Sequence, residues 1–152
     1  MVRKNAGFTL VEILIVVIIL GILAAIVIPQ FTEASNDARV SALVSDLQTV
    51  RSQVELYKVQ HKDCYPGWNG TTVPSGDAFV ADLTGKTDID GASGGTLGPY
   101  LGKFPTNGFN SSAAVRIADG ATDPNAESGS EGWWFNPTTG NFGVNDTDYI
   151  DR

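Results

Sequence analysis

An uninterrupted apolar run near the amino terminus limits what this chain can fold into. Residues 8–28 carry one charged side chain, Glu12, among positions that are otherwise Leu, Ile, Val, Ala, Phe, Gly and Thr. A helix rises about 1.5 Å per residue, so the run is long enough to cross about 30 Å of hydrocarbon. Arg3 and Lys4 precede it, and basic residues favour the cytoplasmic side. The sequence therefore predicts one membrane anchor, with the rest of the chain outside.

The remainder of the chain is a small polar head. Residues 63–152 hold 15 of the 17 glycines, and four basic residues against twelve acidic ones. An acidic surface repels phosphate backbones, so we expect no nucleic-acid partner. The single cysteine, Cys64, excludes an intrachain disulfide and a cysteine-rich zinc site. The head must therefore be stabilised in another way, and packing on a long helix is the first candidate.

Glu12 is the residue that a plain anchor does not explain. An ionised acid at the centre of a bilayer costs about 2.5–3.5 kcal/mol on insertion scales. One interpretation places Glu12 near the headgroups, or protonates it. The other gives it a partner, a positive charge at the same depth in another subunit. If the chain were cut before Phe8, the new α-amino group would supply that charge.

The sequence around this acid has a further pattern. A short basic leader ends at Gly7, and Phe8, Thr-Leu-Val and Glu12 follow it at the start of an apolar helix. This pattern resembles the class III signal of type IV pilins and type II secretion pseudopilins. The resemblance implies cleavage between Gly7 and Phe8 by the prepilin peptidase, and N-methylation of Phe8. It also implies that Glu12 neutralises the Phe8 amine of a neighbouring subunit during assembly. Gly21 and Pro29, which both weaken a helix, bracket the segment that partly unwinds in filaments of this family.

An amphipathic helix follows the apolar run. Its apolar residues recur at spacings of three and four, which indicates a helix that supports a domain with one face: Val40, Leu43, Leu47, Val50, Val54 and Tyr57. The charges on its other side are either solvated or in contact within a filament. We expect four regions: a leader (1–7), a transmembrane and assembly helix (8–29), an amphipathic helix (30–62) and a head (63–152).

The head sequence predicts a short helix at residues 77–84 and strands at 113–118, 132–136 and 141–145. The last two strands flank a compact turn and form the best hairpin candidate. The expected fold class is α+β and pilin-like, with a long amino-terminal helix packed against a small antiparallel sheet. The lone histidine, His61, is expected at the surface or at the end of the long helix.

No metal site is assigned from the sequence, and no cofactor is expected to be required. Major pseudopilins commonly bind calcium late in the chain, and Asn145, Asp146, Asp148 and Asp151 offer oxygen ligands there. The spacing lacks the Gly and the final Glu of an EF-hand loop, so calcium binding stays open. The head shows no nucleophile–base pair and no phosphate-binding glycine motif, so we do not expect an enzyme.

The leading functional interpretation is a structural subunit of a type II secretion pseudopilus. Residues 98–105 resemble the segment that leads into the first strand of the major pseudopilin, and many type IV pilins close a disulfide that one cysteine forbids. The resemblance implies several partners: other copies of the chain, the prepilin peptidase, an inner-membrane assembly platform, minor pseudopilins and the membrane. It implies a bacterial inner-membrane protein with a cytoplasmic amino terminus, a periplasmic head and a periplasmic pseudopilus.

Two alternatives remain at this point. The first is a type IV pilus subunit for adhesion, motility or DNA uptake. The second is a membrane-anchored module whose head binds a ligand through exposed tryptophans, drawn from Trp68, Trp133 and Trp134. This module would stay a monomer and keep residues 1–7.

Overall fold

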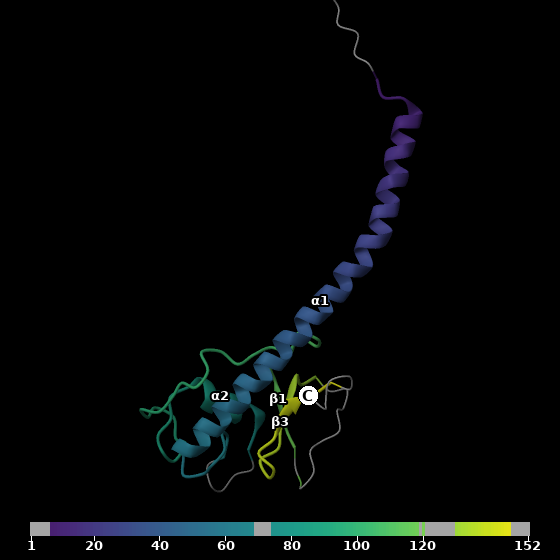
Figure 1. Ribbon diagram of the computed structural model, residues 1–152. Coiled ribbons are helices and arrows are strands. Elements are labelled where there is room, and N and C mark those ends of the chain that lie inside the picture. The colour runs from purple at the N-terminus through teal and green to yellow at the C-terminus, as the bar shows by residue number, and fades with distance from the viewer. Residues whose placement is uncertain (1–6, 69–73, 119, 121–129, 147–152) are drawn as a thin grey trace, which may run out of the picture. The chain divides into compact units, whose positions relative to one another are not determined.

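The structure, a computed structural model, describes residues 7–68, 74–118, 120 and 130–146. The elements within these residues (Figure 1) are α1 (Leu10–Gln60), α2 (Gly76–Thr84), β1 (Val115–Ile117), β2 (Trp133–Phe135) and β3 (Phe142–Val144). The chain divides into two compact units, Met1–Ala38 and Arg39–Arg152. The helix α1 therefore contributes its first part to one unit and its second part to the other.

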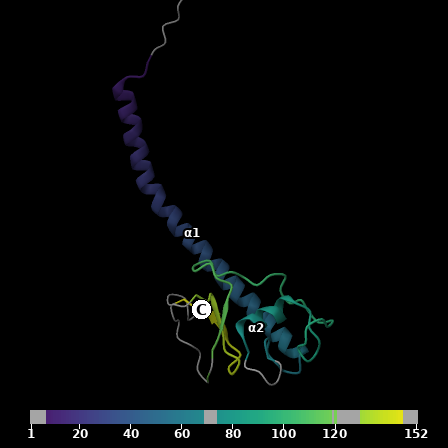
Figure 2. The ribbon, with the colours of Figure 1, turned by 180° about the vertical axis from the view of Figure 1, so that it is seen from behind.

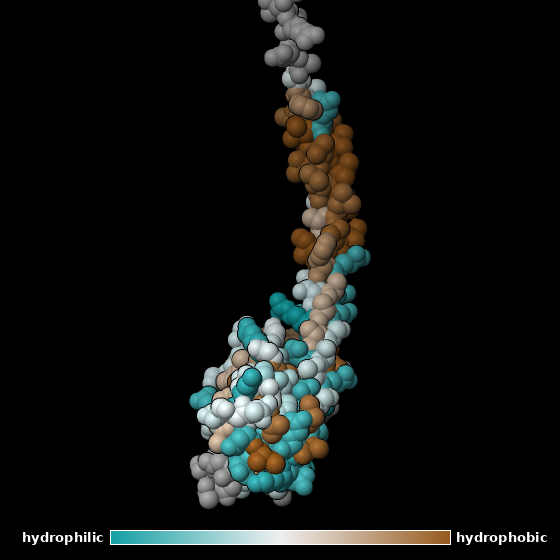
Figure 3. Space-filling model, turned by 90° about the vertical axis from the view of Figure 1, so that its left-hand side faces the viewer, coloured by the Kyte–Doolittle hydropathy of each residue, from teal (hydrophilic) through white to brown (hydrophobic). Residues whose placement is uncertain are grey.

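The first unit consists of the apolar part of α1. Its large apolar side chains, from Phe8 to Ile28, are between 41% and 84% exposed. They form a continuous hydrophobic band in the space-filling view (Figure 3). Within the described part of the chain, α1 is the one helix that is long and apolar enough to cross a membrane. The predicted apolar helix is thus present, and no described residue of its own unit covers its apolar side chains.

The second unit is organised around the buried seam of α1. Its members, each at most 2% exposed, recur at the predicted spacings of three and four: Leu43, Leu47, Val50, Val54 and Tyr57. They belong to one apolar core with the aromatic side chains of α2 and of the sheet. Both ribbon views show this part of α1 lying alongside α2 and the sheet (Figures 1 and 2). The predicted amphipathic helix therefore supports the head, as expected.

The short helix α2 confirms the sequence prediction for this region. Ser75 caps its amino end, where the hydroxyl oxygen accepts the Ala78 N–H at 3.2 Å. Phe79 and Leu83, one turn apart, point into the core and are fully buried. A Cβ at Gly76 would lie 1.8 Å from the Val115 carbonyl oxygen, so only glycine permits α2 to approach β1 this closely.

The sheet is mixed, which corrects the expectation of an antiparallel one. The β2–β3 pair is antiparallel, with Trp133 opposite Val144, and this confirms the predicted hairpin. However, β1 pairs with β2 in parallel, with Val115 opposite Trp133. Parallel neighbours need a crossover connection of about a dozen residues or more, and residues 118–132 supply it. The predicted α+β class is confirmed. The predicted antiparallel direction of β1 is wrong, because the local sequence does not determine in which direction a strand pairs after a long connection.

Two of the three tryptophans are buried, contrary to the ligand-binding interpretation. Trp133 is fully buried, stacks on Phe142 at 5.5 Å between ring centroids, and donates its indole N–H to the Pro105 carbonyl at 3.1 Å. Trp134, on the opposite face of the sheet, is 4% exposed. A Cβ at Gly143 would lie 2.3 Å from its indole ring, so the ring packs directly against the glycine backbone. Only Trp68 is partly exposed among the three.

His61 lies directly after the end of α1, as one of the two expectations had it, but its side chain is in the core and not at the surface. It is 1% exposed and stacks on the ring of Tyr57 at 3.6 Å. One ring nitrogen lies 2.8 Å from the Tyr57 carbonyl oxygen, and the other lies 2.9 Å from the Thr87 hydroxyl. Because His61 follows Tyr57 by four residues, it continues the buried seam just past the end of α1.

Candidate assembly site at the amino terminus

Thr9 and Glu12 form a capping box at the start of α1. Oε2 of Glu12 accepts the Thr9 N–H at 2.7 Å and the Thr9 hydroxyl at 2.8 Å, while the Glu12 N–H donates to Thr9 Oγ1 at 3.3 Å. This reciprocal arrangement satisfies backbone donors that a helix start otherwise leaves open. No role for Thr9 was predicted from the sequence, although Thr-x-x-Glu ahead of an apolar run is a known capping-box signature.

The capping box determines where the Glu12 carboxylate lies. Both bonds from Thr9 end on Oε2, and the group sits in the first turn of α1, where the helix dipole favours a negative charge. Within the described residues, the carboxylate is bonded to Thr9 and not to Phe8. One chain therefore presents a positioned acid. Its pairing with the Phe8 amine of another subunit stays a prediction.

Gly7 and Phe8, on either side of the predicted cleavage point, precede α1. Both are exposed, Phe8 at 84%. A Cβ at Gly7 would meet no atom within 4 Å, so the chain is open at this position. Residues 1–6, which include the basic leader residues, lie outside the described residues. Cleavage at this bond and methylation of Phe8 stay predictions.

Gly21 and Pro29 both lie inside α1, which is continuous from Leu10 to Gln60 in the single chain. A Cβ at Gly21 would meet no atom within 4 Å. The predicted unwinding between these two residues concerns the assembled filament, so it stays a prediction. Proline within a helix removes one backbone hydrogen bond, so Pro29 weakens α1 locally.

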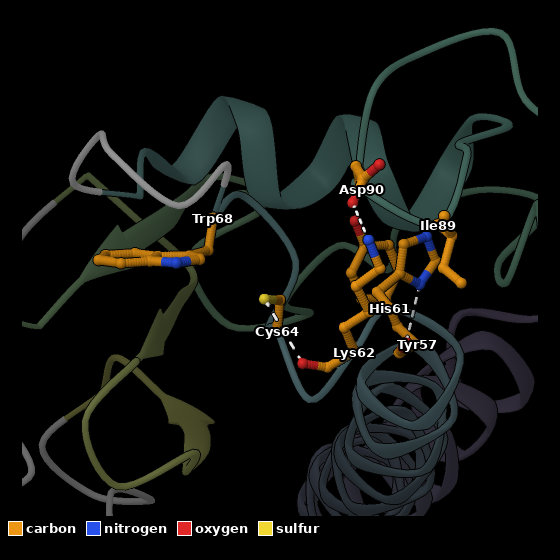
Figure 4. Close-up of a pocket in the computed structure, with 8 residues that line it drawn as sticks. Tyr57, His61, Lys62, Cys64, Trp68, Ile89 and Asp90 are labelled. Carbon is orange, nitrogen blue, oxygen red and sulfur yellow. Dashed lines mark hydrogen bonds and ion pairs between the residues drawn. The ribbon is translucent and has the colours of Figure 1, made fainter.

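The head contains a half-open hollow of about 150 Å³ beside the end of α1 (Figure 4). Its polar groups are engaged with one another. Lys62 forms an ion pair with Asp90, and the Cys64 thiol donates weakly to the Lys62 carbonyl oxygen at 3.8 Å. His61 uses both ring nitrogens within the head. The hollow offers no pair of groups arranged for nucleophilic or acid–base chemistry among the described residues.

The question of calcium binding concerns the last residues of the chain. Asp148 and Asp151 lie outside the described residues. In the described part, no three His, Cys, Asp or Glu side chains group closely enough to hold a metal ion. Oδ1 of Asn145 is buried and has no hydrogen-bond partner among the described residues. Calcium binding stays open, and thermal unfolding in calcium compared with magnesium would test it.

The amino-terminal geometry agrees with what comparison with known proteins finds. Residues 2–28 match the family described as "Prokaryotic N-terminal methylation motif". The chain is 34% identical over 124 residues to the type IV major fimbrial protein FimA of Dichelobacter nodosus, covering 72% of this chain and 76% of that protein. The chain belongs to the type IV pilin and pseudopilin family.

Other members of the pilin and pseudopilin family are also similar. The type II secretion system core protein G of Pseudomonas aeruginosa is 41% identical over 84 residues, which cover 55% of this chain and 56% of that protein. A fimbrial protein of Pseudomonas aeruginosa is 31% identical over 90 residues, covering 59% and 56% respectively. No solved structure matches the chain.

Membership of this family has general consequences. Pilins and pseudopilins are structural subunits rather than enzymes, and similarity to them implies processing by the prepilin peptidase and self-polymerisation. The apolar first part of α1 and the methylation motif suit membrane anchoring. The relatives include both secretion and fimbrial proteins, so the type of filament needs a separate argument.

Proposed function

We propose that this chain is a structural subunit of a type II secretion pseudopilus. In this proposal it is inserted in the bacterial inner membrane with its head in the periplasm, cleaved between Gly7 and Phe8, and polymerised through α1 to support protein export. The observation that carries the proposal is the exposed apolar surface of α1 directly behind a capped, acidic first turn. Such a surface needs either lipid or other subunits around it.

Two features favour the pseudopilus over a surface pilus. The chain has one cysteine, Cys64, so the disulfide of many type IV pilins cannot form within it. Residues 98–105 also resemble the corresponding segment of major pseudopilins. The partners in this proposal are further copies of the chain, the prepilin peptidase, the inner-membrane assembly platform and minor pseudopilins.

The alternative, a type IV pilus subunit for adhesion, motility or DNA uptake, is favoured by one observation. The similarity to the fimbrial protein FimA covers a larger share of this chain than the similarity to the secretion protein G. Deleting the chain in its native cell separates the two. We expect loss of protein export with surface fibres unchanged; loss of long surface fibres with normal export would establish the pilus instead.

Processing gives a second, independent prediction. Protein taken from its native membrane should begin at Phe8 and carry a methyl group on the new amine, because the exposed Gly7–Phe8 bond precedes the helix. Intact mass and amino-terminal sequencing measure both changes at once. A Gly7→Leu variant, which changes only the residue before the cut, serves as the matched control and should keep its leader. Native protein that retains residues 1–7 would contradict both filament functions and support the anchored module.

A further inference from the structure

Trp68 lies between two hollows of the head unit. It is 38% exposed, whereas Trp133 and Trp134 are buried. Together with Cys64 it lines both the half-open hollow of about 150 Å³ described above and a second hollow of about 390 Å³, called the Trp68 groove below. In the close-up view the indole ring extends away from His61 (Figure 4). The ring is therefore accessible, and the groove has the size of a ligand site, about 300–1,000 Å³.

The walls of the Trp68 groove are apolar and held in place. Tyr65, Pro74 and Pro137 line it beside the indole ring. The Tyr65 hydroxyl accepts the Lys58 ammonium at 3.0 Å. A Cβ at Gly140 would overlap the same hydroxyl, so the β2–β3 turn packs directly on Tyr65. Because these walls are formed before any ligand arrives, binding orders few side chains and loses little conformational entropy.

The charges beside the Trp68 groove balance each other. The Lys58 ammonium lies 4.5 Å from the centroid of the Tyr65 ring, so the position that a cationic ligand would take on this ring is already filled. The hydrogen bond to Tyr65 raises the pKa of Lys58, and the nearby carboxylates of Glu55 and Asp63 raise it further. A cationic ligand would meet Lys58, and an anionic ligand would meet Asp63. We therefore expect an uncharged ligand.

Three polar groups at the Trp68 groove are available to a ligand. The Asp63 carboxylate, the Thr138 hydroxyl and the Trp68 indole N–H have no hydrogen-bond partner among the described residues, and all three residues are exposed. An ionised carboxylate only accepts hydrogen bonds, an indole N–H only donates them, and a hydroxyl does both. The matching ligand must therefore carry donors and acceptors around an apolar face.

We propose that the Trp68 groove binds an uncharged glycan, with one sugar ring stacked on the indole. A pyranose ring has an apolar C–H face and a rim of hydroxyl groups, which can donate to Asp63 and accept from the indole N–H. Burying such a face against an aromatic ring is favourable. A proline-rich peptide would also stack on Trp68, but proline has no N–H to donate to Asp63. This binding function goes beyond the proposed filament function and applies equally to a pseudopilus and a pilus.

Tryptophan fluorescence of the full chain tests the site, since Trp68 is the exposed one of the three tryptophans. The chain is kept in a detergent without a sugar headgroup. The probes are chitotriose, which is N-acetylated like the glycan of the cell wall, and the plain glucans cellotriose and maltotriose. We expect at least one probe to shift the emission saturably, with a dissociation constant of about 1 mM or tighter, and to protect it from acrylamide quenching.

The pattern of responses identifies the source of the glycan. A response to chitotriose alone assigns the cell wall, whereas a response to the glucans assigns a polysaccharide outside the wall. Hexaproline serves as the competing ligand. No response to any of the three sugars overturns the proposal, and so does a response to hexaproline alone, which would make the groove a peptide site.

Variants studied by calorimetry locate the binding site. Trp68→Ala should weaken glycan binding about tenfold or more, because the stacking surface is lost. Asp63→Asn should weaken it about threefold or more, because an amide oxygen accepts a hydroxyl less strongly than a carboxylate does. Asparagine also tolerates the positive φ of 61° at this position, so the fold is kept.

The matched control is Val59→Ala, which truncates an apolar side chain of α1 that is 76% exposed and does not line the Trp68 groove. This variant should bind the glycan as the wild type does. Unchanged binding by Trp68→Ala overturns the assignment. If thermal unfolding shows that Trp68→Ala does not fold, unchanged binding by Asp63→Asn overturns it instead.

Discussion

Glu12→Ala should leave the leader cleavage intact and lower filament yield by about tenfold or more. The reason is that covering a charged amine with apolar helices is tolerable only when an opposite charge accompanies it; breaking such a buried pair costs about 3–5 kcal/mol. In the single chain the Glu12 carboxylate is held by Thr9 at the first turn of α1, at the same end of the helix as Phe8. Filament yield after shearing, together with the mass of the membrane-bound subunit, measures assembly and cleavage separately.

The capping box makes it possible to separate two roles of the same acid. Glu12→Gln keeps a side chain that can cap the Thr9 N–H but removes the charge, since glutamine also serves in a capping box. Thr9→Val removes the hydroxyl and keeps the charge. If charge pairing drives assembly, Glu12→Gln fails as completely as Glu12→Ala, while Thr9→Val assembles with a smaller loss. Normal assembly of Glu12→Gln would instead show that Glu12 acts only by capping α1.

The parts of the fold that were predictable from sequence are those encoded by local periodicity. The buried seam from Leu43 to Tyr57 and the helix α2 both follow from apolar spacing. The β2–β3 hairpin follows from two short strand patterns around one compact turn. In each case neighbouring residues determine the structure, so no knowledge of distant contacts is needed.

The parts that were not predictable depend on contacts between distant segments. β1 and β2 are joined by the long connection 118–132, and local sequence patterns do not predict whether strands joined in this way pair in parallel. His61 is buried because Thr87, far along the chain, reaches its second ring nitrogen. Thr9 is different, because its capping role is local and was visible in the Thr-x-x-Glu spacing. The charge of Glu12 indicates a partner subunit, whereas the spacing of Thr9 and Glu12 indicates a contact within its own helix.

The aromatic core gives the largest expected effect on stability. Phe79 of α2 is fully buried, and its ring centroid lies 4.6 Å from that of Phe135, 5.9 Å from that of Phe142 and 6.2 Å from that of Phe104. Phe79→Ala should therefore lower the free energy of unfolding of the head by about 3–5 kcal/mol, through lost burial and the cavity that remains. Denaturant unfolding of the full chain in detergent, followed by tryptophan fluorescence, measures this value.

The same substitution at an exposed position controls for the loss of a phenyl ring as such. Phe31 lies in α1 and is 72% exposed, so Phe31→Ala should change the unfolding free energy by less than about 0.5 kcal/mol. All three tryptophans of the chain lie in residues 63–152, so their fluorescence follows the head rather than the apolar helix. A loss of several kcal/mol is a large part of the stability of a small domain, and Phe79→Ala should leave much of the head unfolded at 37 °C. Similar values for the two variants would mean that Phe79 and the three rings around it do not form the core of the head.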